Sequence, residues 1–230
     1  MSHTYAANTL HSPKRLADTI AKYTPEGAID VVMPIPDSSR PAAMQVARKL
    51  DKLGMRSSDT AQIFFDNVRV PKRNRIGEEG QGFKQIMYNF NSERMGMAAS
   101  CTAYARVCLD EAIAYAKERK TFGKPIAQHQ VIRHKIVDMA QKVAVSQAML
   151  EMLAWRLGQG ESPVAEICMM KNQATQTMAH CASEAVQIFG GAGFMRGIKV
   201  ERIYREVKVN AIGGGTEEIM KDLASRQMGL

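Results

Sequence analysis

The feature that most constrains the fold is a seam of mostly apolar side chains in the middle of the chain. Its members follow one another at alternating steps of four and three residues, without a slip. They are Ile132, Ile136, Met139, Val143, Ser146, Leu150, Leu153 and Leu157. This spacing keeps one stripe on one side of a long helix and suits antiparallel helix packing. We therefore expect a helix over about 127–157 and a helical bundle around it.

A second long helix is expected before this seam. From Glu79 onward the spacing of apolar residues becomes helical, and the helix should run to about Arg119, because Gly123 and Pro125 interrupt the pattern. Its expected stripe consists of Phe83, Ile86, Phe90, Met97, Cys101, Tyr104 and Cys108.

Further helices are expected after the seam. Ser162 is suited to an N-cap and Pro163 to the first helical position of a third long helix, which Gly190-Gly191 would end. The expected buried face of that helix carries Ile167, Met170, Ala174, Met178, Cys181, Ala185 and Ile188. A shorter helix at about Lys199–Asn210 and a final helix capped by Thr216 complete the prediction.

The first third of the chain has a different pattern. Ala28–Pro36, Val46–Met55 and Gln62–Val70 are rich in β-forming residues and are predicted to be strands, while 1–27 offers only one short helical pattern, LADTIAKY. The predicted fold is therefore mainly α, with a partial β domain over 1–75 and an up-and-down four-helix bundle over 76–230.

Composition narrows the function classes. The net charge is +8, but no nucleic-acid-binding motif accompanies the basic residues, so a nucleic-acid partner is not expected. No apolar run is long enough to span a bilayer, and no secretory signal is evident. The four cysteines form no CxxC pair, which predicts reduced core thiols. No Glu-x-x-His, HExxH, P-loop or GxSxG pattern occurs, and no metal site is predicted.

Glu93 stands out because it falls on the apolar stripe of its helix, three residues after Phe90 and four before Met97. A carboxylate in such a place must be paired, hydrated or protonated. It could form an ion pair with a neighbouring helix, or it could be a general base held in a dry pocket. Arg94, the next residue, is expected to point away from the stripe.

Three glycine-containing segments could bind an anion or a carbonyl oxygen. The corner 118–130 (ERKTFGKPIAQHQ) groups Arg119, Lys120 and Thr121 beside a glycine, which suits a pyrophosphate but also an ordinary solvated turn. Gln187–Gly191 offers bare amides or a simple glycine C-cap. Gly213–Thr216 opens a helix N-terminus with exposed amides, or is only a linker.

The sequence resembles the acyl-CoA dehydrogenase family. The resemblance rests on KLGMRSSDTAQIFFDNVRVP, ERKTFGKPIAQHQ, QIFGGAGF and ERIYREVKVNAIGGGTEEIM, which follow the order and spacing of the family over roughly residues 45–228. It implies a C-terminal four-helix bundle preceded by the later part of a middle β domain, so the first half of a family enzyme is expected to be absent. The implied reaction takes the α-proton of an acyl-CoA with a carboxylate and passes the β-hydrogen as hydride to N5 of FAD.

The resemblance also indicates which residue is the base. Many family members carry a glutamate at the position of Gly214, which has no side chain here. The isovaleryl and long-chain branches instead carry the base at the position of Glu93, so Glu93 is the predicted base, with Glu217 as the fallback. The amide of Gly214 would still polarise the thioester carbonyl, because any residue supplies an N–H.

The remaining site residues are carried over motif by motif. The positions that resemble cofactor contacts are Arg119, Thr121, Phe122, His129, Gln130, Gln187, Ile188, Phe189, Gly190, Gly191, Thr216, Glu217 and Glu218, several of which would reach the FAD of a neighbouring subunit. The positions that resemble the lining of the acyl-CoA site are Asn91, Ser92, Arg94 and Gly215.

The resemblance predicts a flavoprotein oxidoreductase of fatty acid β-oxidation. It would form a homodimer or homotetramer, pass electrons to an electron-transfer flavoprotein, and work in the mitochondrial matrix or the bacterial cytoplasm. Two alternatives stay open: a truncated, non-catalytic oligomerisation bundle, and a flavin oxidase of the same fold.

Overall fold

The computed structural model describes residues 5–6, 31–33, 43–49, 52–56, 61–62 and 69–230. The chain divides into two compact units, Met1–Glu79 and Gly80–Leu230. In the first unit, β3 pairs antiparallel with three other strands. The elements of this unit are β1 (Tyr5–Ala6), β2 (Val31–Met33), β3 (Ala43–Lys49), β4 (Ala61–Gln62) and the 3₁₀ turn η1 (Lys72–Asn74).

The strands are shorter than predicted. β2 confirms the centre of the predicted strand 28–36, whereas β3 begins three residues before Val46 and ends at Lys49. The extension to Met55 was wrong, because residues 53–54 form a bend and Met55 adopts a φ of 53° in the left-handed region. Only Gln62 of the strand predicted at 62–70 is a strand residue among those described, and the short helix predicted at 16–23 lies outside the described residues.

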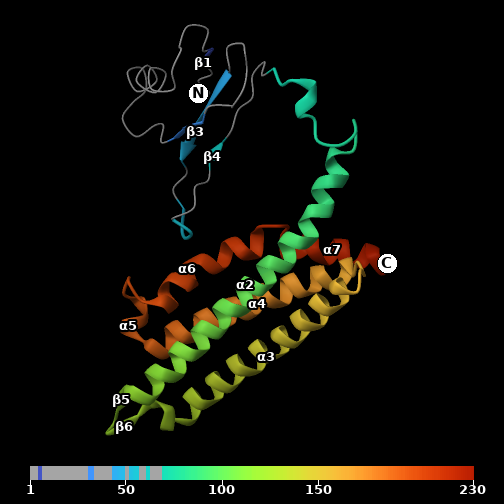
Figure 1. The fold of residues 1–230 in the computed structure, drawn as a ribbon. Helices are drawn as coiled ribbons and strands as arrows, with labels where there is room; N and C mark the ends of the chain where they lie inside the picture. Colours follow the sequence, from blue (N-terminus) through green and yellow to red (C-terminus); the bar gives the residue numbers. More distant parts are fainter. Residues whose placement is uncertain (1–4, 7–30, 34–42, 50–51, 57–60, 63–68) are drawn as a thin grey trace. The chain divides into compact units, whose positions relative to one another are not determined.

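The second unit is a helical bundle, which confirms the predicted mainly-α fold (Figure 1). Its helices are α2 (Gly82–Glu118), α3 (Gln130–Gly158), α4 (Val164–Phe189), α5 (Gly191–Phe194), α6 (Lys199–Ile212) and α7 (Glu217–Gln227). Between α2 and α3 lies a hairpin of β5 (Lys120–Thr121) and β6 (Lys124–Pro125), followed by the 3₁₀ turn η2 (Ile126–Gln128). In Figure 1 this hairpin lies at the opposite end of the bundle from α7.

Helix α4 is the centre of the bundle, because it packs against α2, α3, α6 and α7. Every residue of its predicted face is buried. Many of the completely buried residues of α2 and α4 have small side chains, which let two helix backbones approach closely. Those that are completely buried include Ala98, Cys101, Ala105, Ala112, Ala174, Cys181, Ala182 and Ala185.

The seam of α3 is largely confirmed. Met139, Val143, Ser146 and Leu153 are buried, whereas Leu157 at the helix end is 37% exposed. Ser146 shares a hydrogen bond of 2.9 Å with the buried hydroxyl of Thr177 on α4, which explains a polar residue within an apolar seam.

Two local predictions were wrong. The first turns of α2 are not buried within the bundle, since Phe83 is 75% and Ile86 53% exposed. The predicted N-cap at Ser162 is also absent: α4 begins at Val164, because Pro163 has a ψ of 70° and lies outside the helix. The cap at Thr216 is confirmed, as its hydroxyl accepts from the amide of Ile219 at 3.4 Å.

Three general properties follow from the described part of the chain. None of its helices combines the length and the apolar content needed to cross a membrane. Within the same residues, no group of three or more His, Cys, Asp or Glu side chains is placed to hold a metal ion. The four cysteines are free and buried, which confirms the prediction of reduced core thiols.

Leu153→Ala is expected to lower the free energy of unfolding by about 2–5 kcal/mol, because it removes a completely buried side chain from the seam of α3. Met152→Ala is the matched control: it truncates the neighbouring residue, whose side chain is 46% exposed, and should change stability by less than about 1 kcal/mol. Urea unfolding followed by circular dichroism measures both. Equal losses in the two variants would contradict the seam.

Burial raises the pKa of Cys101 to about 11 and that of Cys108 and Cys181 to about 12. These thiols are therefore protonated at pH 8, and the thiolate is the reactive form. We expect the folded chain to react with Ellman's reagent only as fast as it unfolds, and all four cysteines to react at once in guanidinium chloride. A rapid phase in the native protein would show that at least one thiol is accessible.

Candidate functional site

The glycine segment between α6 and α7 forms a tight turn. Gly213 has φ −62° and ψ 150°, and Gly214 follows with φ 67°, as in the two central residues of a type II turn. Gly215 also has a positive φ, 112°, and a Cβ there would lie 2.5 Å from the Cε of Met220. The turn therefore requires glycine at 214 and 215. Among the described residues, the amide N–H groups of Gly214 and Gly215 have no hydrogen-bond acceptor.

Arg94 connects this turn to α2. Its Nε donates to the carbonyl of Gly214 at 3.0 Å, although the two residues lie 120 positions apart. Its Nη1 donates to Oδ1 of Asn91 at 3.3 Å, and its guanidinium lies 5.4 Å from the ring centre of Phe90. The prediction that Arg94 points away from the buried face was wrong: only 4% of it is exposed.

Glu93 does not lie on the buried face of α2, and this part of the prediction was wrong. The buried face runs through Arg94, Ala98 and Cys101, so the residue before Arg94 points outward. Glu93 is exposed, and its Oε1 accepts a hydrogen bond from Nδ2 of Asn89 at 2.6 Å. Its helical turn nevertheless adjoins the glycine turn, because Arg94 contacts Gly214. Glu93 thus lies near the glycine turn, as predicted, but it is exposed and not held in a dry pocket.

Lys171 was missed by the sequence analysis. It lies on the buried face of α4, four residues after Ile167, and has no exposed surface. Its Nζ donates to the carbonyl of Gly215 at 2.6 Å and to that of Ala211 at 3.0 Å. The sequence did contain a signal for it, because Lys171 is a charged residue within an apolar helix face. Only Glu93 was singled out on that ground.

The N-terminus of α7 is fixed by residues of α4. Nδ2 of Asn172 donates to the carbonyl of Glu217 at 2.9 Å, and Nε2 of Gln176 donates to the Glu217 carboxylate at 2.8 Å. Glu218 is exposed, and hydrogen bonds from its own backbone amide and from Thr216 lower the pKa of its carboxyl. Glu217 is thus already engaged, whereas Glu93 is the more accessible carboxylate.

The hairpin at the other end of α2 has a strained tip. Phe122 and Gly123 have φ values of 49° and 79°, which a two-residue type I′ turn requires. Phe122 is 96% exposed and meets the ring of His129 edge-on, with 6.4 Å between ring centres. The Oγ1 of Thr121 lies 3.2 Å from Nε2 of His129, so these predicted cofactor residues form one local cluster.

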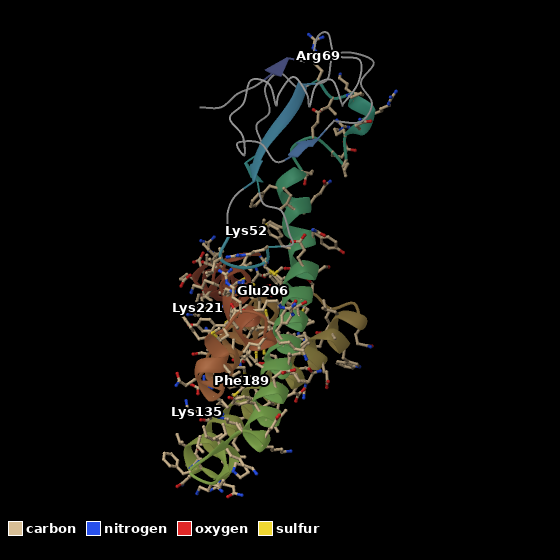
Figure 2. All side chains as sticks on the ribbon, turned by 90° about the vertical axis from the view of Figure 1, so that its left-hand side faces the viewer. Lys52, Arg69, Lys135, Phe189, Glu206 and Lys221 are labelled. Atoms are coloured by element: carbon tan, nitrogen blue, oxygen red, sulfur yellow. The ribbon has the colours of Figure 1, made fainter. Side chains whose placement is uncertain are left out.

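A cavity of about 450 Å³ joins this corner to the end of α4. Six predicted cofactor residues line it: Arg119, Thr121, Ile188, Phe189, Gly190 and Gly191. Tyr115, Ile126 and Ala192 complete the lining and were not predicted. The rings of Tyr115 and Phe189 stack at 4.1 Å, which fixes one wall. Figure 2 shows Phe189 nearer than Lys221 to the hairpin end of the bundle. Phe122, His129, Gln130 and Gln187 do not line this cavity.

The lining of the cavity suits an anionic group with a planar ring. Arg119 contributes an exposed guanidinium, and a Cβ placed on Gly190 or Gly191 would meet no atom within 4 Å, so the backbone there is open to a ligand. The stacked aromatic pair provides an apolar wall. A dinucleotide, with its diphosphate and its ring systems, fits this combination of donors and surfaces.

The two groups of candidate residues lie far apart in one chain. Glu93 lies in α2 and Arg119 directly follows its last residue, Glu118; the 26 steps between them correspond to about 40 Å at about 1.5 Å per residue. The glycine turn lies beside the residues around Arg94, whereas the cavity lies beside Tyr115 and Arg119. One chain thus carries the Glu93 carboxylate and the glycine turn at one place and the cavity beside Arg119 at another.

Comparison with known proteins identifies relatives of this arrangement. The family model "Acyl-CoA dehydrogenase, C-terminal domain" matches residues 80–229. The probable acyl-CoA dehydrogenase YngJ of Bacillus subtilis is 37% identical over 185 residues, which cover 80% of this chain and 49% of that protein. The probable acyl-CoA dehydrogenase YdiO of Escherichia coli is 37% identical over 192 residues, which cover 84% of this chain and 50% of that protein.

Solved structures show the same fold. The crystal structure of a probable acyl CoA dehydrogenase from Mycobacterium abscessus superposes with a TM-score of 0.77 at 40% identity, covering 86% of this chain and 56% of that one. The chain spans about half the length of the curated relatives that it matches.

Gly214→Ala is expected to lower the free energy of unfolding by about 1–2 kcal/mol, because a side chain at a φ of 67° is strained and its Cβ would lie 3.0 Å from Sδ of Met97. Gly96→Ala is the matched control. This helical glycine has open space around it, so alanine should raise the free energy of unfolding, by at most about 1 kcal/mol. Urea unfolding measures both. A Gly214 variant as stable as the wild type would show that the turn conformation is wrong.

Proposed function

The chain belongs to the acyl-CoA dehydrogenase family, and on that basis we propose that it takes part in the FAD-dependent α,β-dehydrogenation of an acyl-CoA thioester. We further propose that Glu93 is the base, as in the isovaleryl and long-chain branches. The observation that carries this proposal is the 3.0 Å hydrogen bond from Arg94 to the carbonyl of Gly214, because it joins two motifs that the reaction needs together.

Glu93 is suited to take a proton from a substrate that lies outside the helical bundle. Its carboxylate is exposed, it belongs to the same helical turn as Arg94, and its hydrogen bond from Asn89 leaves further oxygen lone pairs free. Glu217 is the weaker candidate, since it is less exposed than Glu93 and its carboxylate is bound to a side chain of another helix, Gln176 on α4. Water would have to be excluded from Glu93 by the substrate, the cofactor or other parts of the protein.

The amides of the glycine turn are suited to bind the thioester carbonyl. Those of Gly214 and Gly215 have no acceptor among the described residues, so they are available to an oxygen on which negative charge develops. Removal of the α-proton places such charge on the carbonyl oxygen, and amide donors fixed in advance stabilise it. Asn91 and Ser92, next to Arg94 on α2, are proposed to line the same acyl-CoA site.

The cofactor residues are proposed to be those of the corner. Bound FAD supplies a hydride acceptor for the β-hydrogen. Arg119 is suited to its diphosphate, while Gly191 offers a backbone amide and Gly190 an open backbone surface beside the stacked Tyr115 and Phe189 rings. Phe122, His129, Gln130 and Gln187 would contribute from the rim, and Thr216 to Glu218 from the other end of the chain.

The separation of about 40 Å between Glu93 and Arg119 favours an oligomer. In a homodimer or homotetramer, the corner of one copy would hold the cofactor that serves Glu93 of another copy. An electron-transfer flavoprotein is the proposed acceptor, and fatty acid β-oxidation the proposed context. The named relatives are bacterial, which favours a cytoplasmic setting over a mitochondrial one.

Glu93→Gln is expected to lower the rate of anaerobic flavin reduction by an acyl-CoA by about 10²–10⁴-fold, because an amide cannot accept the α-proton. Stopped-flow absorbance of the FAD-loaded chain measures the rate. Glu217→Gln tests the alternative base. Glu151→Gln, on the exposed side of α3, is the matched control and should leave the rate unchanged.

Three outcomes would contradict parts of this proposal. A chain that takes up no FAD in a visible absorption titration would contradict the cofactor assignment. If Glu93→Gln still reduced the flavin and Glu217→Gln did not, Glu217 would be the base. If air reoxidised the reduced flavin faster than an electron-transfer flavoprotein did, the protein would be an oxidase.

A further inference from the structure

Lys171 is a buried cation without a carboxylate partner. Its side chain has no exposed surface, and no carboxylate lies within 4.0 Å of its Nζ in the described part of the chain. Removing an ammonium from water costs several kcal/mol unless hydrogen bonds or charges compensate for it. Here the compensation comes from two backbone carbonyls, those of Ala211 and Gly215, at 3.0 and 2.6 Å.

The surroundings of Lys171 only partly compensate for its charge. Ala211 lies in the last turn of α6, where the helix dipole presents its negative end. Burial lowers the pKa of Lys171; Cys101 and Glu217 oppose that shift, and the charge of Arg94 adds to it. Arg94, itself 4% exposed, holds the carbonyl of Gly214. Two buried cations therefore hold consecutive carbonyls of one turn, an arrangement that stability alone does not favour.

The turn needs such restraint because it consists of Gly213, Gly214 and Gly215. Glycine has the greatest backbone freedom of all residues, so three in succession form a segment with little intrinsic order. In a trans peptide the C=O and N–H groups point in opposite directions. Holding the carbonyl of Gly214 against Arg94 therefore directs the amide of Gly215, one of the two proposed carbonyl-binding amides, away from that cation. Holding the carbonyl of Gly215 against Lys171 fixes the next peptide, whose amide belongs to Thr216.

Resting on the function proposed above, we propose that Lys171 is a positioning residue of the thioester site. Its buried ammonium fixes the glycine turn through the carbonyls of Ala211 and Gly215, and so holds the amide donors of the turn at the substrate carbonyl. Its charge also lies behind the turn, where it stabilises the negative charge that develops on the thioester oxygen. Lys171 touches neither substrate nor cofactor and acts through the backbone.

The test compares Lys171→Met with Thr177→Val, a control on the same helix. Methionine fills the space of the lysine stem but cannot donate, whereas valine removes the buried hydrogen bond to Ser146 and leaves the turn intact. Hydrogen exchange measured by mass spectrometry should accelerate about tenfold or more over residues 211–217 in Lys171→Met only. This measurement requires neither cofactor nor substrate.

The functional effect is measured on the FAD-loaded chain. Lys171→Met should lower kcat by about ten- to a hundredfold with little change in KM, as expected when an interaction made in the transition state is lost. The carbonyl stretch of bound ¹³C-labelled enoyl-CoA, followed by infrared difference spectroscopy, should lose part of its shift to lower wavenumber. Thr177→Val should keep both the rate and the stretch.

The possible failures are distinguishable. Unchanged exchange over 211–217 in Lys171→Met overturns the positioning role, as does exchange that accelerates equally throughout the bundle. Lys171→Gln is the second variant, because it keeps a donor without the charge. Unfolding of both Lys171 variants would show a purely structural residue and overturn the proposal. A wild-type chain that binds neither FAD nor acyl-CoA overturns instead the proposed function on which the role rests.

Discussion

Close packing of α2 against α4 is the constraint on which the bundle depends. The two helices pack extensively, and their completely buried residues include alanines and cysteines such as Ala105 and Ala182, whose small side chains let two backbones lie near each other. The same proximity lets Arg94 of α2 and Lys171 of α4 reach a single turn that lies between α6 and α7. Larger side chains in the contact would separate the helices and leave that turn without its donors.

The glycine turn depends on side chains of other helices for its order. A turn with positive φ at Gly214 and Gly215 has little order of its own, and a side chain at either position would collide with Met97 or Met220. The order comes from the Arg94 guanidinium and the Lys171 ammonium, which are buried and therefore require acceptors, and the backbone carbonyls of the turn are those acceptors. The proposed base, Glu93, lies on α2 next to Arg94, which contacts this turn.

Whether large apolar residues marked the buried face of a helix depended on the size of the residues in contact. On α4, large apolar residues such as Met170 and Met178 mark the face unambiguously, and the prediction was confirmed. On α2 the contact is made by alanine, cysteine and threonine, which carry little hydrophobic signal, so the large exposed residues Phe83 and Ile86 misplaced the stripe. The error exchanged the environments of Glu93 and Arg94, which are adjacent in the chain but point in different directions.

The sequence by itself determined the helices, the glycine breaks, the cap at Thr216 and the two motifs that form the corner. These depend on local spacing and on backbone preferences, which neighbouring residues fix. Only the tertiary structure decided that Lys171 and Arg94 meet carbonyls 44 and 120 residues away, and that Tyr115 stacks on Phe189 beside the cavity. Such contacts depend on the distance between packed helices and on the rotation of each helix about its axis. A hydrophobic pattern with small residues specifies neither quantity.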